Sequence, residues 1–138
     1  MKHILIMEDD IALALDWKNA FELNGYDVTL SSDGGEAEAL LKKNEYDLVI
    51  TDLFVKEGIG GLHVSLKLYQ MGRKAPPAIA VTGVATSRDN QGPDQNIFLE
   101  QARKLGSVGE IQKPFPAGEL VVMAQSVFEA KSKDTKTG

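Results

Sequence analysis

Short apolar stretches recur along the chain, and each is followed by residues with the spacing of an amphipathic helix. The first, third and fourth stretches show no regular polar alternation. Strands of this kind are typical of a parallel sheet that helices cover on both faces. The order of strands and helices therefore predicts an α/β fold on a five-stranded, mainly parallel sheet. The predicted strands are residues 4–7, 28–31, 48–51, 78–82 and 109–112.

A helix is predicted after each strand, from apolar residues that recur three, four or seven positions apart. Leu13, Trp17 and Phe21 mark the first helix, which is expected to end at Gly25. Trp17, Phe21 and Phe128 are expected in the core. Further helices are predicted around residues 37–41, over 62–69, over 98–105 and after Pro116.

Two polar segments do not fit this pattern. Residues 84–94, VATSRDNQGPD, predict a loop longer than most connections, of a kind that is often functional. Residues 131–138, KSKDTKTG, contain no apolar residue and predict a flexible C-terminal tail. The domain itself is therefore assigned to residues 1–130.

Composition narrows the functional classes. The 138 residues contain no cysteine, which excludes thiol catalysis, disulfides and cysteine-based zinc sites. A net charge of −5 argues against direct binding of nucleic acid. No apolar run approaches the roughly 18 residues of a membrane span, so no membrane association is expected.

Side chains that could bind a ligand or react lie at the ends of four of the predicted strands. Glu8-Asp9-Asp10 follow the first strand, Asp52 the third and Lys113 the fifth, and Thr82 ends the fourth. Parallel sheets bind ligands outside the carboxyl ends of their strands, so these side chains are expected to meet at one edge. Crowded carboxylates call for a cation, and Mg²⁺ suits a small open acidic cluster. A lysine and a hydroxyl beside them would stabilise a transferring phosphoryl group, with an aspartyl phosphate as the product.

Each of these residues also has an ordinary structural explanation. Acids after the first strand favour a helix N-terminus, and Asp10 is expected to be the helix N-cap. Asp52 could begin a turn, Thr82 could be a β-branched strand residue and Lys113 could be a solvated lysine. Their occurrence after four strands in order favours the site. His3 and His63 are too few and too scattered to indicate a zinc site.

Five segments stand out along the chain: ILIMEDD at 4–10, NGYDV at 24–28, YDLVITD at 46–52, AVTG at 80–83 and QKPF at 112–115. Together they resemble the receiver domain of two-component response regulators, of the CheY-like superfamily, over about residues 2–130. This resemblance implies a flavodoxin-like, doubly wound (βα)₅ fold and a cytoplasmic signalling protein rather than an enzyme acting on other substrates. It implies a histidine kinase or phosphotransfer protein as phosphoryl donor and a downstream protein partner.

The resemblance also assigns roles to residues. It implies that Asp52 is the phosphoacceptor and that Glu8, Asp9, Asp52 and the backbone carbonyl of Phe54 hold Mg²⁺. It implies that Thr82 and Lys113 contact the phosphoryl group, and that the Lys113–Pro114 peptide is cis.

The chain departs from the family pattern at three places. Lys56 stands where the family usually has proline, Glu110 replaces the aromatic switch residue, and residues 84–94 lengthen the chain between Thr82 and Lys113. An alternative is therefore a receiver-like interaction module that does not switch by phosphorylation. A small-molecule phosphohydrolase is disfavoured, because Phe54 stands where a second carboxylate would be needed. A flavin-binding domain is disfavoured, because Glu-Asp-Asp follows the first strand instead of a phosphate-binding loop.

Overall fold

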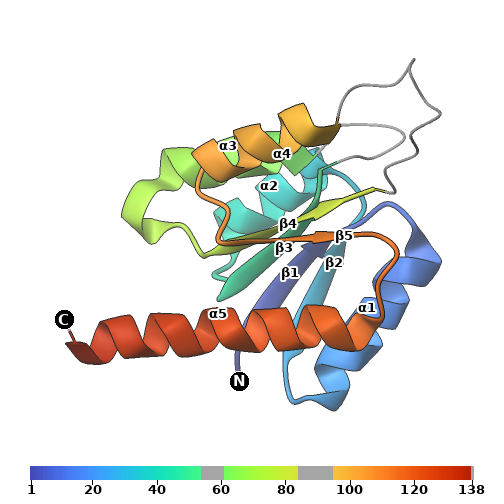
Figure 1. The fold of residues 1–138 in the computed structure, drawn as a ribbon, viewed down its shortest axis with the longest axis horizontal. Helices are drawn as coiled ribbons and strands as arrows, with labels where there is room; N and C mark the ends of the chain where they lie inside the picture. The colour runs from blue at the N-terminus through green and yellow to red at the C-terminus, as the bar shows by residue number, and fades with distance from the viewer. Residues whose placement is uncertain (54–60, 84–94, 138) are drawn as a thin grey trace.

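Five parallel strands form a single sheet in the computed structural model, which describes residues 1–53, 61–83 and 95–137 (Figure 1). The strand order is β2-β1-β3-β4-β5, which is the flavodoxin-like order of a doubly wound fold. The predicted α/β architecture is therefore confirmed. The strands are β1 (His3–Met7), β2 (Asp27–Ser31), β3 (Leu48–Asp52), β4 (Ala78–Thr82) and β5 (Gly109–Gln112).

Helices cover both faces of the sheet. In Figure 1, α1 and α5 lie on one side, and α2, α3 and α4 lie on the other. A short 3₁₀ helix, η1, leads from α3 towards β4. The helices are α1 (Ile11–Leu23), α2 (Gly34–Lys43), α3 (Gly61–Met71), η1 (Gly72–Lys74), α4 (Gln95–Lys104) and α5 (Ala117–Thr137).

The sheet separates two apolar layers. Successive β1 side chains point to opposite faces, so Ile4 and Ile6 join one layer while Leu5 and Met7 join the other. All four are fully buried, as expected for a strand without polar alternation. Trp17, Phe21 and Phe128, which were predicted core residues, pack together on the α1 and α5 side. No helix in the described parts of the chain is long and apolar enough to cross a membrane.

The last helix is longer than the sequence pattern predicted. The expected tail began at residue 131, whereas α5 continues to Thr137. Phe128 is the last buried residue of α5 among those whose side chains the structure describes, and it lies close to the predicted boundary. Residues 131–137 contain no glycine or proline, so their helix propensity does not oppose continuation of the helix. The predicted loop at 84–94 lies outside the described residues.

Candidate functional site

The carboxyl ends of β1, β3, β4 and β5 bring the candidate residues to one edge of the sheet. Asp52 ends β3 in register with Val81, the residue before Thr82. Thr82 ends β4, and its carbonyl accepts a 3.0 Å hydrogen bond from the backbone N–H of Lys113. Parallel pairing thus places residues that lie far apart in the sequence beside one another, as the sequence predicted.

Three carboxylates gather at this edge. Oxygen atoms of Glu8, Asp9 and Asp52 lie within 4.8 Å of one another. Glu8 is 2% exposed and Asp52 is 1% exposed, so two of the acids are removed from water. Burial raises the pKa of Glu8 to about 7, and the nearby Asp52 charge adds to the rise. Such a cluster is stabilised by positive charge.

Lys113, the residue after β5, supplies positive charge to this cluster. Its Nζ lies 2.9 Å from Asp52 Oδ2 and forms a second ion pair with Glu8 Oε1. Burial on its own would lower the pKa of Lys113, but hydrogen bonds to the two carboxylates outweigh burial and raise it. Lys113 therefore stays protonated between the two buried acids.

Comparison with known proteins places this arrangement in a family. The family model described as "Response regulator receiver domain" matches residues 4–125. The chain belongs to this family. It is 33% identical over 126 residues to the aerobic respiration control protein ArcA of Escherichia coli (strain K12), covering 91% of this chain and 48% of ArcA. Response regulator MprA of Mycobacterium sp. (strain KMS) is 28% identical over 131 residues, covering 95% of this chain and 52% of MprA.

Solved structures agree on the receiver fold. A CheY-like receiver domain protein from Methanospirillum hungatei JF-1 has a TM-score of 0.83 at 23% identity, covering 97% of this chain and 98% of its own. The chemotaxis protein CheY4 of Vibrio cholerae has a TM-score of 0.74 at 24% identity, covering 92% of this chain and 98% of its own. By contrast, the chain spans about half the length of the curated relatives described above.

Sequence analysis of this receiver domain missed a role for Trp17 near the site. The Lys113 Nζ lies 5.8 Å from the centroid of the Trp17 ring. Phe115 stacks on the same ring, with centroids 5.3 Å apart, and the intervening Lys113–Pro114 peptide is cis, as predicted. The indole of α1 thus packs against the segment that carries Lys113. Helical spacing identified Trp17 only as a core residue, and the aromatic residue two positions after Lys113 was the available signal.

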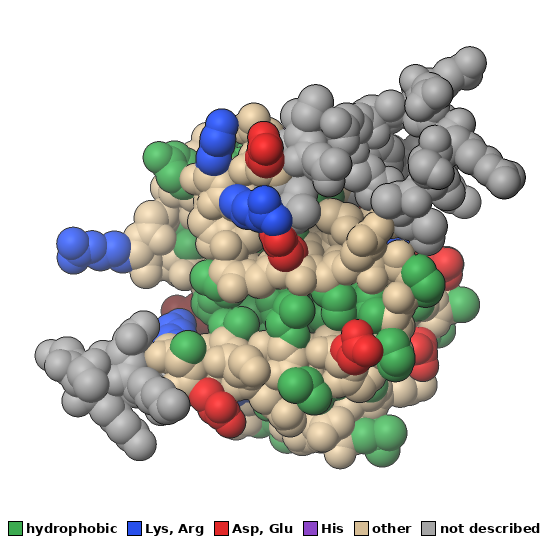
Figure 2. Space-filling view, viewed as in Figure 1, with side chains coloured by type: hydrophobic (Ala, Val, Ile, Leu, Met, Phe, Trp, Pro, Cys, Tyr) green, Lys and Arg blue, Asp and Glu red, His purple; other side chains and the backbone are tan. Residues whose placement is uncertain are grey.

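Glu110 occupies the position where the family pattern predicted an aromatic switch residue. Its carboxylate accepts two hydrogen bonds from Arg103, one from Nε at 2.7 Å and one from Nη2. These hydrogen bonds lower the pKa of Glu110. Figure 2 shows basic beside acidic side chains over α4 and β5, above hydrophobic side chains that gather between β5 and α5. An ion pair therefore links α4 to β5 where an aromatic ring was expected.

The other candidates are not members of the acidic cluster or lie outside the described residues, although the backbone N–H of Asp10 donates a 3.1 Å hydrogen bond to Glu8 Oε2. Asp10 is the N-cap of α1, and its side chain accepts a 3.1 Å hydrogen bond from the N–H of Leu13. His3 makes a 2.7 Å hydrogen bond with Thr29, and His63 pairs with Glu38. The Phe54 carbonyl, Lys56 and residues 84–94 lie outside the described residues.

Proposed function

We propose that this receiver domain takes a phosphoryl group onto Asp52 and uses the phosphorylated state to alter a surface for a protein partner. One observation carries the proposal: the Lys113 ammonium contacts both Asp52 and Glu8 at a buried edge where Asp9 completes a three-carboxylate cluster. A purely structural ion pair would not need a third acid beside it. Receiver domains are signalling proteins that bind Mg²⁺ at an acidic pocket of this kind.

The donor set fits Mg²⁺. Carboxylate oxygens are hard ligands. Burial, and after it the charge of Asp52, raises the pKa of Glu8, so a divalent ion beside these acids would stabilise their charged forms. Glu8, Asp9 and Asp52 would hold the ion, together with the Phe54 carbonyl, which lies outside the described residues. A bound Mg²⁺ would neutralise negative charge on the carboxylates and the phosphoryl oxygens.

The chain's own residues account for the remaining chemistry. An Asp52 carboxylate oxygen attacks the phosphorus of a phosphohistidine or an acyl phosphate. A new O–P bond forms while the bond from phosphorus to the donor's nitrogen or oxygen breaks, and the leaving group keeps the electron pair. The Lys113 ammonium then pairs with the phosphoryl oxygens, and the Thr82 hydroxyl donates a hydrogen bond to them.

Partners and context follow from this role. The donor is a histidine kinase or a phosphotransfer protein, and the recipient of the signal is a downstream protein. We assign the receiver domain to residues 1–130 and its place of action to the cytoplasm, which is typical of response regulators. Direct binding of nucleic acid or membrane forms no part of the proposal.

A second candidate is a receiver-like interaction module that does not switch. The Arg103–Glu110 pair favours it, because this ion pair occupies the position of the aromatic switch residue. Hydrogen exchange with and without beryllofluoride and Mg²⁺ distinguishes the two candidates. A switching domain changes protection beyond the acidic edge, on α4 or β5, whereas a non-switching module changes protection at the edge alone.

Incubation with acetyl phosphate and Mg²⁺ is expected to add one phosphoryl group to the protein, detected by intact mass. Asp52→Asn should abolish the adduct, since the amide is not a nucleophile, and chelation of Mg²⁺ should abolish it in the unmodified protein. Asp16→Asn is the matched control, because Asp16 is an exposed acid on α1. An adduct that persists in Asp52→Asn, or no adduct in the unmodified protein, contradicts the proposal.

Beryllofluoride with Mg²⁺ is expected to change the fluorescence emission of Trp17, the single tryptophan of the chain. A phosphoryl analogue on Asp52 draws the Lys113 ammonium towards itself, and that ammonium lies 5.8 Å from the indole centroid. Steady-state fluorescence measures the effect, with Lys43→Ala as a control at an exposed lysine. The change should disappear in Lys113→Ala; an unaltered response in that variant refutes the coupling.

A further inference from the structure

Lys113 is held at both ends of its side chain. Its backbone N–H donates a 3.0 Å hydrogen bond to the carbonyl of Thr82, and its ammonium pairs with Asp52 and Glu8. A flexible aliphatic stem with many rotamers joins these two ends. Holding an ammonium on such a stem in one place costs conformational entropy. A further contact that limits the rotamers would therefore help to keep the ammonium at the acidic edge.

The ring of Trp17 supplies such a contact. The Lys113 Nζ lies over this ring, 5.8 Å from its centroid, which is within the roughly 6 Å range of cation–π interactions. Trp17 is fully buried in the apolar layer on the α1 and α5 side, so close packing restricts movement of the ring. The Lys113 side chain is 20% exposed, and a cation–π contact strengthens as the cation loses water. The indole is therefore a fixed surface beside the ammonium.

One helix sets the positions of this ring and of an acid that pairs with Lys113. Phe115 stacks on the Trp17 indole, with an angle of 21° between the two planes, so α1 contacts the segment after β5 through two side chains. At the other end of α1, the backbone N–H of its N-cap, Asp10, donates a 3.1 Å hydrogen bond to Glu8 Oε2. The indole and the Glu8 carboxylate are thus both tied to α1.

The indole N–H indicates that the ring face, rather than hydrogen bonding, favours a tryptophan at this position. Nε1 of Trp17 is buried and has no hydrogen-bond partner among the described residues. A buried donor without a partner costs free energy that a phenylalanine or a leucine would not incur. Tryptophan nevertheless offers the strongest π face for a cation, and the contact with the Lys113 ammonium uses that property.

We propose that Trp17 is a positioning residue for Lys113, whose ammonium the indole holds beside Asp52, where it can pair with a phosphoryl group. This inference rests on the proposed function. Glu8 and Asp52 are the proposed Mg²⁺ ligands, and Asp52 is also the proposed phosphoacceptor, so both carboxylates have a further partner in the working site. The indole is not a ligand of the ion, so its contact with the ammonium does not compete with metal binding.

Rates of phosphorylation by acetyl phosphate with Mg²⁺, followed by intact mass, test this role. Trp17→Leu removes the ring and is expected to slow the reaction by about tenfold, a factor that corresponds to a partly desolvated cation–π contact. Trp17→Phe keeps a π face and should recover most of the rate. In Lys113→Met, which has no ammonium to position, adding Trp17→Leu should have no further effect. A ring that served packing alone would slow the reaction in both backgrounds.

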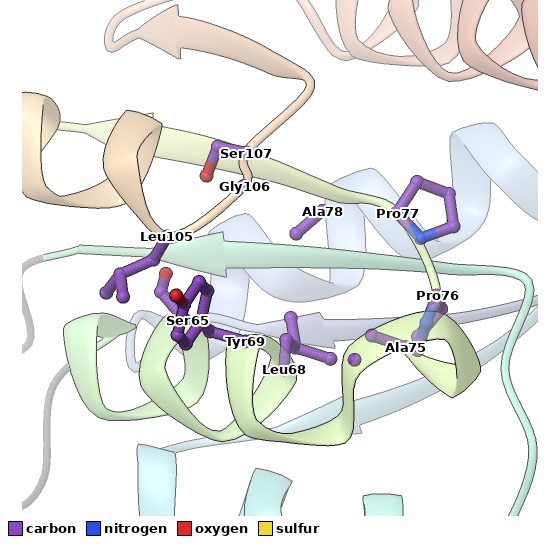
Figure 3. A pocket seen from close by; sticks show the side chains of 11 residues that line it. Ser65, Leu68, Tyr69, Ala75, Pro76, Pro77, Ala78, Leu105, Gly106 and Ser107 are labelled. Atoms are coloured by element: carbon purple, nitrogen blue, oxygen red, sulfur yellow. The ribbon is translucent and has the colours of Figure 1, made fainter.

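Two aromatic residues away from the acidic edge provide matched controls. Phe128 of α5 lies in the same apolar layer and also has a lysine over its ring, with Lys2 Nζ 4.8 Å from the centroid. Tyr69 of α3 lines a pocket of about 310 Å³ that includes Ala78, at the end of β4 far from the acidic edge (Figure 3). Phe128→Leu and Tyr69→Leu should each leave the phosphorylation rate within about twofold of the unmodified protein.

A measurement without metal or phosphoryl donor separates this inference from the proposed function. The free energies of unfolding of Trp17→Leu, Lys113→Met and the double variant form a cycle whose non-additive part measures the contact between ring and ammonium. That part should correspond to about tenfold in the unfolding equilibrium constant. The changes in Phe128→Leu and Lys113→Met should simply add. Trp17→Met replaces Trp17→Leu in both experiments if the leucine variant does not fold.

The outcomes are distinct. An additive Trp17–Lys113 cycle, equal phosphorylation rates in Trp17→Leu and the unmodified protein, or equal slowing by Trp17→Leu with and without the ammonium overturns the positioning role and leaves phosphorylation of Asp52 standing. Absence of an adduct in the unmodified protein overturns the proposed function instead, and a non-additive cycle would then still support the hold of the indole on the ammonium.

Discussion

Replacing Lys113 with alanine is expected to lower the free energy of unfolding by about 3 kcal/mol at pH 8 in metal-free buffer, since removing one partner of a buried ion pair leaves the other charge uncompensated. Glu8 and Asp52 would then face each other, 2% and 1% exposed, without the ammonium that contacts both. Denaturant titration measures the loss. Lys43→Ala, at an exposed lysine, should change the free energy of unfolding by less than about 0.5 kcal/mol.

Two further measurements separate lost charge from lost packing in this variant. Lys113→Met keeps most of the aliphatic stem, so a similar loss in Lys113→Met assigns the effect to the ammonium. Adding Glu8→Gln to Lys113→Ala should recover a large part of the stability, because one of the two repelling acids is removed. Full stability of Lys113→Ala in metal-free buffer would contradict the assignment of Lys113 as the compensating cation.

Much of the fold could be predicted because strand ends coincide with changes in polarity. The first strand was predicted at residues 4–7 and is His3–Met7, and the third was predicted at 48–51 and is Leu48–Asp52. The first strand lies between Lys2 and Glu8, and the third begins after Asp47 and ends in Asp52, so charged residues mark both ends of each apolar run. A flexible tail was predicted from residue 131, whereas α5 continues to Thr137, because polar residues without glycine or proline give no signal to stop a helix.

The acidic edge was predictable for a topological reason. Parallel strands carry the residues that follow them to the same edge, so the order along the chain is sufficient to bring Glu8, Asp52 and Lys113 together. The contact of Trp17 with Phe115 depends instead on how α1 packs against the segment after β5, which no local pattern encodes.

Glu8 should make the free energy of unfolding of the metal-free protein fall as the pH rises. Most carboxylates have the opposite effect, because their pKa is lowered on folding. Its pKa is raised from 4.5 to about 7 in the folded protein, mainly by burial. The folded state therefore holds this proton more tightly than the unfolded state does. Its contribution to the free energy of unfolding is largest below about pH 4.5 and is lost as the pH rises through about 7.

Across this pH window the free energy of unfolding is expected to fall by roughly 3 kcal/mol, because each unit by which the pKa of Glu8 is raised corresponds to about 1.4 kcal/mol. Because other groups also titrate, the measured quantity is the difference in free energy of unfolding between the unmodified protein and Glu8→Gln, from denaturant titrations at several pH values. Glu22→Gln, at an exposed acid of α1, is the matched control. If the unmodified protein and Glu8→Gln have the same pH dependence, Glu8 does not titrate as a buried acid.

Mg²⁺ should oppose this loss, because the ion binds the deprotonated carboxylates and competes with the proton. Above about pH 7, saturating Mg²⁺ is therefore expected to raise the free energy of unfolding, and below about pH 5 it should have little effect. Glu8→Gln and Asp52→Asn should each weaken this stabilisation, whereas Glu22→Gln should leave it unchanged. A Mg²⁺ effect that is equal in all of these proteins would place the ion somewhere other than the acidic edge. Burial of Glu8 thus disfavours the charged, metal-free site and favours occupancy by the cation.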